Sequence, residues 1–201
     1  MQRNYVVVLA VLAVGAAGSL LPAADSSISG SVKAAGLSSN ADAVVYVQQA
    51  PGGAKAPAQP VTMDQRKMQF SPQVLPVVLG TTVRFLNSDP TPHNVFSPDG
   101  EKYNLGTWPE GQSKEHSFGI CAKFPCVYTQ LCRVHPEMEG FVVVLPNSYF
   151  AVSDKEGHFS IEGVPPGQYQ VAVWHPKLKG QPQAVTLEAG KAAHLDISLA
   201  R

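Results

Sequence analysis

Three residues that can bind a soft metal ion lie within seven positions of one another. They are Cys132, His135 and Met138, in Cys132-Arg-Val-His135-Pro-Glu-Met138, and apolar segments typical of β-strands flank them on both sides. A thiolate, an imidazole and a thioether together suit copper, because sulfur favours the cuprous ion and imidazole binds both oxidation states. The segment therefore predicts a copper site on a short loop between two strands.

A complete electron-transfer copper site needs one more histidine. Such sites combine two histidines and one cysteine in a trigonal arrangement with a long axial bond to methionine. The obvious donor is His93, which is expected in a turn-rich loop after a strand at 82–86. Taken singly, Cys132 is more simply a buried thiol, and each histidine a polar surface or core residue. The three residues in this order, in a β-protein, favour copper.

The residues around this set carry a resemblance to a known family. Phe70-x-Pro72, Val77-x-x-Gly80-x-x-Val83-x-Phe85-x-Asn87-x-Asp89, His93-Asn94-Val95 and Cys132-x-x-His135-x-x-Met138 together resemble a cupredoxin, over roughly residues 61–146. The resemblance implies a Greek-key β-sandwich that holds one type 1 copper ion. His93, Cys132 and His135 would be its equatorial ligands, Met138 would be the axial ligand, and Asn94 would hydrogen-bond the cysteine loop.

The spacing within the ligand loop departs from one branch of that family. Two residues separate His135 from Met138, whereas plastocyanin-like loops usually have four. The same spacing resembles the binuclear copper-A loop of cytochrome oxidase, but that site needs a second cysteine at the position where this chain has Tyr128. A mononuclear site is therefore expected. If Met138 does not bind, the copper ion would have an open position.

The two remaining cysteines, Cys121 and Cys126, lie in a loop between two predicted strands. In an oxidising compartment a local disulfide is the natural interpretation, and it leaves Cys132 free for metal. Extra metal ligands are the alternative, which is disfavoured because no histidine accompanies these cysteines at zinc-site spacing.

The composition indicates which elements position these residues. Seventeen glycines and 17 prolines break the 201-residue chain into short apolar segments separated by turns, as in all-β proteins. We expect an all-β fold with two small sandwiches. The formal net charge is zero and no cluster of lysine or arginine occurs, so nucleic acid is excluded as a partner.

The N-terminus has the pattern of an export signal. Arg3 precedes an apolar run at 5–21, which is followed by the small residues Ala23 and Ala24. Residues 1–24 are therefore expected to be a cleaved signal peptide or a retained N-terminal membrane anchor, and the protein is expected in the periplasm or outside the cell.

The two ends of the chain also resemble one family. Segments 25–50 and 147–201 together resemble a carboxypeptidase regulatory-like domain, a small β-sandwich in which a short loop joins the two parts. The resemblance rests on Gly30-Ser-Val32, Ala41-Asp-Ala-Val-Val-Tyr-Val47, Val152-Ser-Asp-Lys-Glu-Gly-His-Phe-Ser-Ile161 and Val164-Pro-Pro-Gly-Gln-Tyr-Gln-Val-Ala-Val173. It implies that residues 61–146 are inserted in that loop, behind a linker at 51–60. The alternative is two sequential domains.

The favoured function is a one-electron carrier for a redox partner such as a c-type cytochrome or an exported oxidoreductase. Copper storage or delivery to another exported protein is the alternative. An enzyme is disfavoured, because four ligands leave no open position for a substrate.

Overall fold

The computed structural model describes residues 24–53 and 55–201, and its regular elements in these ranges are 16 β-strands. The predicted all-β class is confirmed. Nearly all of the expected signal or anchor, at 1–24, lies outside the described residues. Within the described residues, no helix has the length and apolar character needed to cross a membrane.

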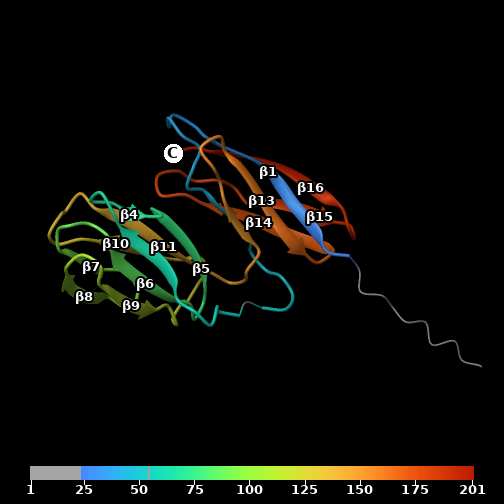
Figure 1. Cartoon of the computed structure of the whole chain (residues 1–201). Coiled ribbons are helices and arrows are strands. Elements are labelled where there is room, and N and C mark those ends of the chain that lie inside the picture. The colour runs from blue at the N-terminus through green and yellow to red at the C-terminus, as the bar shows by residue number, and fades with distance from the viewer. Residues whose placement is uncertain (1–23, 54) are drawn as a thin grey trace, which may run out of the picture.

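The strands form four sheets (Figure 1). The first has the order β13 (His158–Val164), β1 (Ser26–Ala34), β16 (Ala192–Leu199), and the second the order β12 (Phe150–Val152), β2 (Val44–Val47), β14 (Gly167–Trp174), β15 (Gln183–Leu187). The third has the order β5 (Val74–Val78), β11 (Glu139–Leu145), β10 (Cys126–Leu131), β7 (His93–Ser97), β8 (Tyr103–Trp108). The fourth has the order β4 (Phe70–Ser71), β3 (Val61–Gln65), β6 (Thr82–Asn87), β9 (Ser113–Ser117).

Strands from the two ends of the chain pair with each other. β1 runs antiparallel to β13 and parallel to β16, and β2 lies between β12 and β14. The strands from β3 to β11 pair among themselves in the third and fourth sheets. In Figure 1 the blue strand β1 accordingly lies beside the red β16, away from the green and yellow strands.

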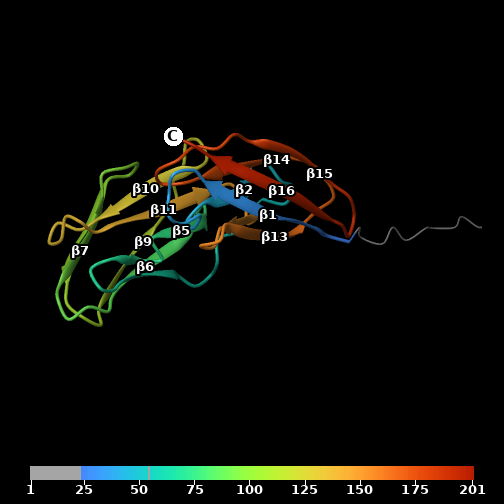
Figure 2. The same ribbon diagram turned by 90° about the horizontal axis from the view of Figure 1, so that it is seen from above.

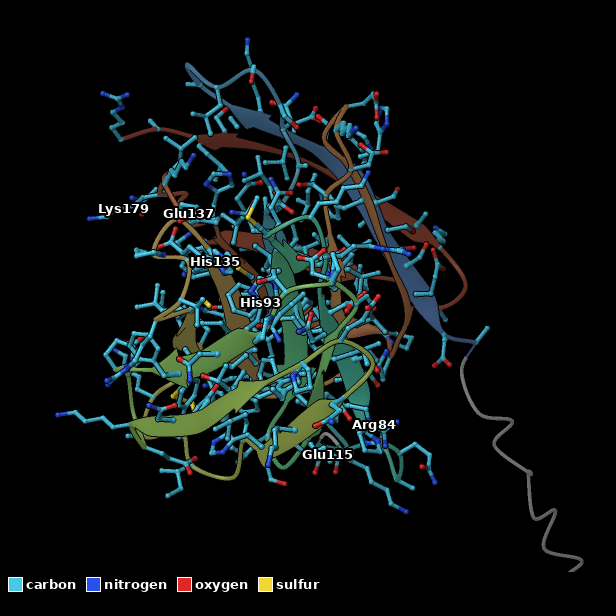
Figure 3. The ribbon with its side chains drawn as sticks, turned by 60° about the vertical axis from the view of Figure 1, so that its left-hand side comes forward. Arg84, His93, Glu115, His135, Glu137 and Lys179 are labelled. Atoms are coloured by element: carbon cyan, nitrogen blue, oxygen red, sulfur yellow. A yellow bond between two sulfur atoms is a disulfide. The ribbon has the colours of Figure 1, made fainter. Side chains whose placement is uncertain are left out.

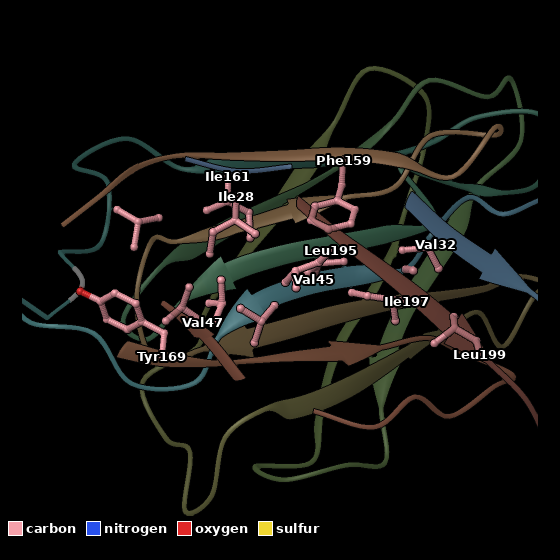
Figure 4. Packing of buried hydrophobic residues seen from close by; sticks show 14 of the residues in the cluster. Ile28, Val32, Val45, Val47, Phe159, Ile161, Tyr169, Leu195, Ile197 and Leu199 are labelled. Atoms are coloured by element: carbon pink, nitrogen blue, oxygen red, sulfur yellow. The ribbon is translucent and has the colours of Figure 1, made fainter. Parts of the chain in front are cut away.

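Three apolar cores separate the four sheets. The first core lies between the first and second sheets and includes Ile28, Val45 and Leu195 (Figure 4). The second, between the third and fourth sheets, includes Phe85 and Trp108, and the third joins the second and third sheets. Figure 2 shows from above that the two pairs of sheets lie against each other.

Strands β2 and β11 show how the sequence encodes this stack. Successive side chains of a strand point to opposite faces, so a strand buried on both faces must be apolar throughout. In β11, Val142 and Val144 enter one core, whereas Phe141, Val143 and Leu145 enter the other. β2, with the sequence Val-Val-Tyr-Val, is likewise buried at all four positions.

The structure corrects one expectation close to the site. His93 is not in a loop but is the first residue of β7, which pairs with β8 through His93 and Trp108. Neither β7 nor β8 is predicted from the sequence. The prolines before His93 indicate a turn. In β8 the buried and exposed side chains do not alternate regularly, because several of its side chains are exposed and Gly106 has φ +83°.

Candidate metal centre

His93, Cys132 and His135 meet at one end of the third sheet. β7 and β10 are neighbours, so the start of β7 lies beside the residues that follow β10. The ligand atoms of the three side chains all lie within 4.8 Å of one another. The Nδ1 atoms of His93 and His135 are 3.0 Å apart, and Cys132 Sγ is 3.9 Å from His93 Nδ1. Figure 3 shows the two histidines side by side.

These separations fit a single metal ion. Two atoms bonded to one ion at about 2.0–2.3 Å, with an angle near 120°, lie about 3.5–4 Å apart. The observed 3.9 Å lies within that range, and the 3.0 Å between the two imidazole nitrogens is about half an ångström shorter than its lower end. Because one thiolate and two imidazoles are donors that copper accepts, the residues present fit a copper ion.

Asn94 connects the cysteine to the neighbouring strands. Its backbone N–H donates to Cys132 Sγ at 3.4 Å, and its side-chain oxygen accepts from the backbone N–H of Arg133 at 3.4 Å. Its amide nitrogen donates to Asn104 Oδ1 and to the carbonyl of Gly106, so both ends of the side chain are occupied. These bonds restrict the position of the buried sulfur.

His93 is fully buried and is oriented by a carboxylate. Its Nε2 lies 2.9 Å from Oδ2 of Asp89, four residues earlier in the chain. An ionised carboxylate only accepts hydrogen bonds, so Asp89 favours the form of His93 that has hydrogen on Nε2, and Nδ1 is the nitrogen that lies toward Cys132 and His135. Asp89 is not among the site residues predicted from the sequence. The available signal was its position between a buried strand and His93.

Asp89 also accepts bonds from a distant turn. The backbone N–H groups of Lys67 and Met68 donate to its two oxygens at 2.6 and 2.8 Å. Burial raises the pKa of Asp89, but the hydrogen bonds from Met68, His93 and Lys67 outweigh it, so the pKa lies below its ordinary value. The carboxylate is therefore the stable form in the folded protein.

Met138 is 1% exposed and packs in the same core as Cys132. Its backbone N–H donates to the carbonyl of His135 at 3.0 Å, which closes the ligand loop into a turn before β11. The two-residue spacing between His135 and Met138 therefore places Met138 in the second core.

The other cysteines and histidines lie apart from this cluster. Cys121 and Cys126 form a disulfide, and Cys132 is free. His175 Nδ1 accepts from two backbone N–H groups, and His116 stacks on Tyr103 with 3.8 Å between ring centroids. Burial lowers the pKa of both histidines. Among the described residues, one group of three or more possible metal ligands is found, namely His93, Cys132 and His135.

The fold and the site together define an all-β protein in which one cysteine and two histidines lie close enough to hold a metal ion. Residues 137–200 match the carboxypeptidase regulatory-like domain, which confirms that part of the sequence resemblance. The match begins at the ligand loop and includes β11. No curated protein is similar to this sequence.

Several solved structures are similar to part of the chain. A purple cupredoxin from Nitrosopumilus maritimus has 28% identity and a TM-score of 0.37, over 42% of this chain and 98% of its own. A reduced amicyanin variant has 23% identity and a TM-score of 0.39, over 50% and 97%. A copper-containing nitrite reductase from Thermus scotoductus has 23% identity and a TM-score of 0.41, over 58% of this chain and 28% of its own.

Proposed function

We propose that this protein is an exported mononuclear copper protein that carries single electrons between redox partners. The observation that carries the proposal is the convergence of His93 Nδ1, His135 Nδ1 and Cys132 Sγ within 4.8 Å at the end of a β-sandwich. Bound copper would supply a one-electron couple between the cuprous and cupric states.

The protein's own residues favour electron transfer by limiting movement. Asn94 holds the sulfur, Asp89 holds His93, and both ligand segments join strands of one sheet. Ligands fixed in this way change position little when the charge of the centre changes. Burial of His93 and Cys132 also keeps water from the ion. Met138 is proposed as a weak axial ligand.

His135 is the proposed contact for electrons entering and leaving. It is the partly exposed member of the three, and the side chains of Val134 and Pro136 on either side of it are exposed. This apolar margin suits a short-lived complex with a redox protein such as a c-type cytochrome or an exported oxidoreductase. Because the formal net charge is zero, long-range steering of that partner should be weak.

The strand pairings also support a proposal for the domain organisation. Segments 25–50 and 147–201 would form one unit, and residues 61–146 would be inserted in it behind the linker at 51–60. The pairing of β1 with β13 and β16 supports this arrangement over two sequential domains. Residues 1–24 are proposed as the signal peptide or membrane anchor.

The decisive experiment is copper titration of the purified protein, followed by its visible spectrum. We expect one cupric ion per chain, an intense thiolate-to-copper charge-transfer band, and reversible one-electron reduction. Cys132→Ser should abolish the band, whereas His158→Ala, at a histidine whose side chain is 72% exposed, should leave it unchanged. Absence of a thiolate band, with cuprous copper lost rapidly to weak chelators, would replace electron transfer by storage or delivery.

A further inference from the structure

The turn at 66–69, which joins β3 to β4, has an unusual backbone. Lys67 and Met68 both have φ +56°, and Arg66 and Gln69 exchange two backbone hydrogen bonds across them. Two-residue hairpin turns with φ above zero at both positions usually contain Asn-Gly, because most side chains disfavour this region. Such strain persists where neighbouring groups hold it in place.

Asp89 is the group that holds this turn. Its Oδ1 accepts from Lys67 N at 2.6 Å, and its Oδ2 accepts from Met68 N at 2.8 Å. The side chain is nearly buried, and its own backbone N–H donates to Asn87 Oδ1 at 2.9 Å. The carboxylate therefore lies between two fixed pieces of backbone and has little freedom to turn away.

The same carboxylate determines which nitrogen of His93 carries the proton. Oδ2 is 2.9 Å from His93 Nε2, and a carboxylate can only accept. His93 Nδ1 then has a free lone pair, and the Nδ1 of His135, 3.0 Å away, must donate to it when no metal is bound. His135 is partly exposed and can exchange its proton with water, whereas His93 is fully buried.

We propose that Asp89 is the positioning residue of the metal centre. It links the 66–69 turn to His93 and keeps this imidazole, before metal binds, in the form with hydrogen on Nε2 and a lone pair on Nδ1. Of the two imidazoles, only His135 then changes when metal enters, because its Nδ1 proton passes to water and its Nε2 takes up a proton from water. Cys132 also loses its thiol proton to water. The proposal rests on the proposed copper function, and it deepens that function.

The test is Asp89→Asn, which preserves size but replaces one acceptor oxygen by an NH₂ donor. The N–H groups of the turn need the remaining oxygen, so the new NH₂ faces His93 and favours hydrogen on Nδ1. Long-range ¹H–¹⁵N NMR of the metal-free protein distinguishes the two forms of each imidazole. We expect hydrogen on His93 Nε2 in the wild type and on Nδ1 in the variant, with copper affinity lowered about 10–100-fold.

Asp99→Asn is the matched control. Asp99 accepts from the backbone N–H of Thr129 at 2.7 Å, so this substitution also removes a carboxylate that caps backbone, but away from His93. It should leave the His93 signals and the copper affinity unchanged. A general loss of structure would affect both variants, whereas a positioning role affects only the Asp89 variant.

The wild-type spectrum alone can overturn the proposal, even if the Asp89→Asn protein does not fold. Hydrogen on His93 Nδ1 in the metal-free wild type would contradict it, as would an unchanged His93 form and copper affinity in a folded Asp89→Asn protein. Failure of the wild type to bind copper would instead refute the proposed function, because the NMR result does not depend on copper.

Discussion

Cys132 and Met138 place two sulfur atoms in one core, but the structure assigns them different surroundings. Cys132 accepts a hydrogen bond from Asn94 and faces both histidines. Met138 is buried among the apolar side chains of the second core. A buried methionine contributes to packing whether or not it binds metal, so burial alone does not distinguish the two roles.

Substitution of Met138 by leucine separates packing from ligation. Met138→Leu conserves volume, so it should lower the free energy of unfolding of the metal-free protein by less than about 1.5 kcal/mol. If the thioether is an axial ligand, its loss leaves three ligands, a coordination number that suits the cuprous ion better than the cupric ion. The reduction potential should then rise while the thiolate band remains. Voltammetry of both proteins measures the change. Equal potentials would show that Met138 serves the core only.

At the scale of elements, the connection between β6 and β7 determines where His93 lies. Asn87, at the end of β6, is fully buried and makes three hydrogen bonds with its side chain. Its amide donates to the carbonyls of Thr91 and Trp108, and its oxygen accepts from the N–H of Asp89. The loop thus has a defined path despite its two prolines.

Asn87→Ala should therefore damage both the fold and the site. It leaves two carbonyls and one N–H without partners, which should lower the free energy of unfolding by about 2–4 kcal/mol. Copper affinity should fall too, because Asp89 and His93 lose their support. Urea unfolding of the metal-free protein and a copper titration test these effects. Thr91→Ala, which keeps the Thr91 carbonyl, is the control, and a loss of equal size there would contradict the role of Asn87.

At the scale of the whole molecule, the third core joins the two pairs of sheets into one structure. Val44, Tyr46 and Ala172 of the second sheet pack against Phe141 and Val143 of the third, among other residues. The ligand loop runs directly into β11, which contributes to this core. Loss of packing in this core should therefore also promote unfolding of the sheets that carry the ligand residues.

Adjacent valines of β11 test that coupling, because they face different cores. Val143→Asp places a charge in the third core and should split thermal unfolding into two transitions, of which only one shifts when copper is added. Val142→Asp places the charge in the core behind the metal centre and should cost about 3–5 kcal/mol and abolish the copper band. Calorimetry with and without copper distinguishes them. One unsplit transition in Val143→Asp would contradict the role of this core in joining the two pairs of sheets.

Buried tyrosines give the whole molecule a dependence on alkaline pH. Burial raises the pKa of Tyr46, Tyr103, Tyr128 and Tyr169 above the ordinary value of 10.0. The unfolded chain therefore loses these protons first as the pH rises. The free energy of unfolding should be unaffected by these groups below pH 10 and should fall above it.

Urea unfolding of the metal-free protein between about pH 8 and about pH 11.5 measures this decline. Tyr128 donates from its hydroxyl to the carbonyl of Ile120 at 2.7 Å, and ionisation would remove that bond. Tyr128→Phe should be less stable at pH 8 and should lose less stability between the two limits. If the free energy of unfolding of Tyr128→Phe falls as steeply as that of the wild type, Tyr128 does not contribute to the alkaline loss of stability.

The sequence by itself was sufficient for the all-β class and for the choice of the candidate metal-binding side chains. Glycine and proline spacing divides the chain into strands, and the chemistry of Cys132, His135 and Met138 is a property of the side chains themselves. The apolar runs of β2 and β11 also predict strands that are buried on both faces, but they do not determine which strand covers each face.

The tertiary structure alone decided how these residues meet. His93 and Cys132 are 39 positions apart, and only the pairing of β7 with β10 brings them together. Asp89 and the turn at 66–69 were not foreseen, because a hydrogen bond from backbone N–H leaves no mark on residue type. The pairing of β1 with β16 is equally nonlocal. Local preferences select strands, whereas the partners of each strand depend on which faces the complete chain can bury together.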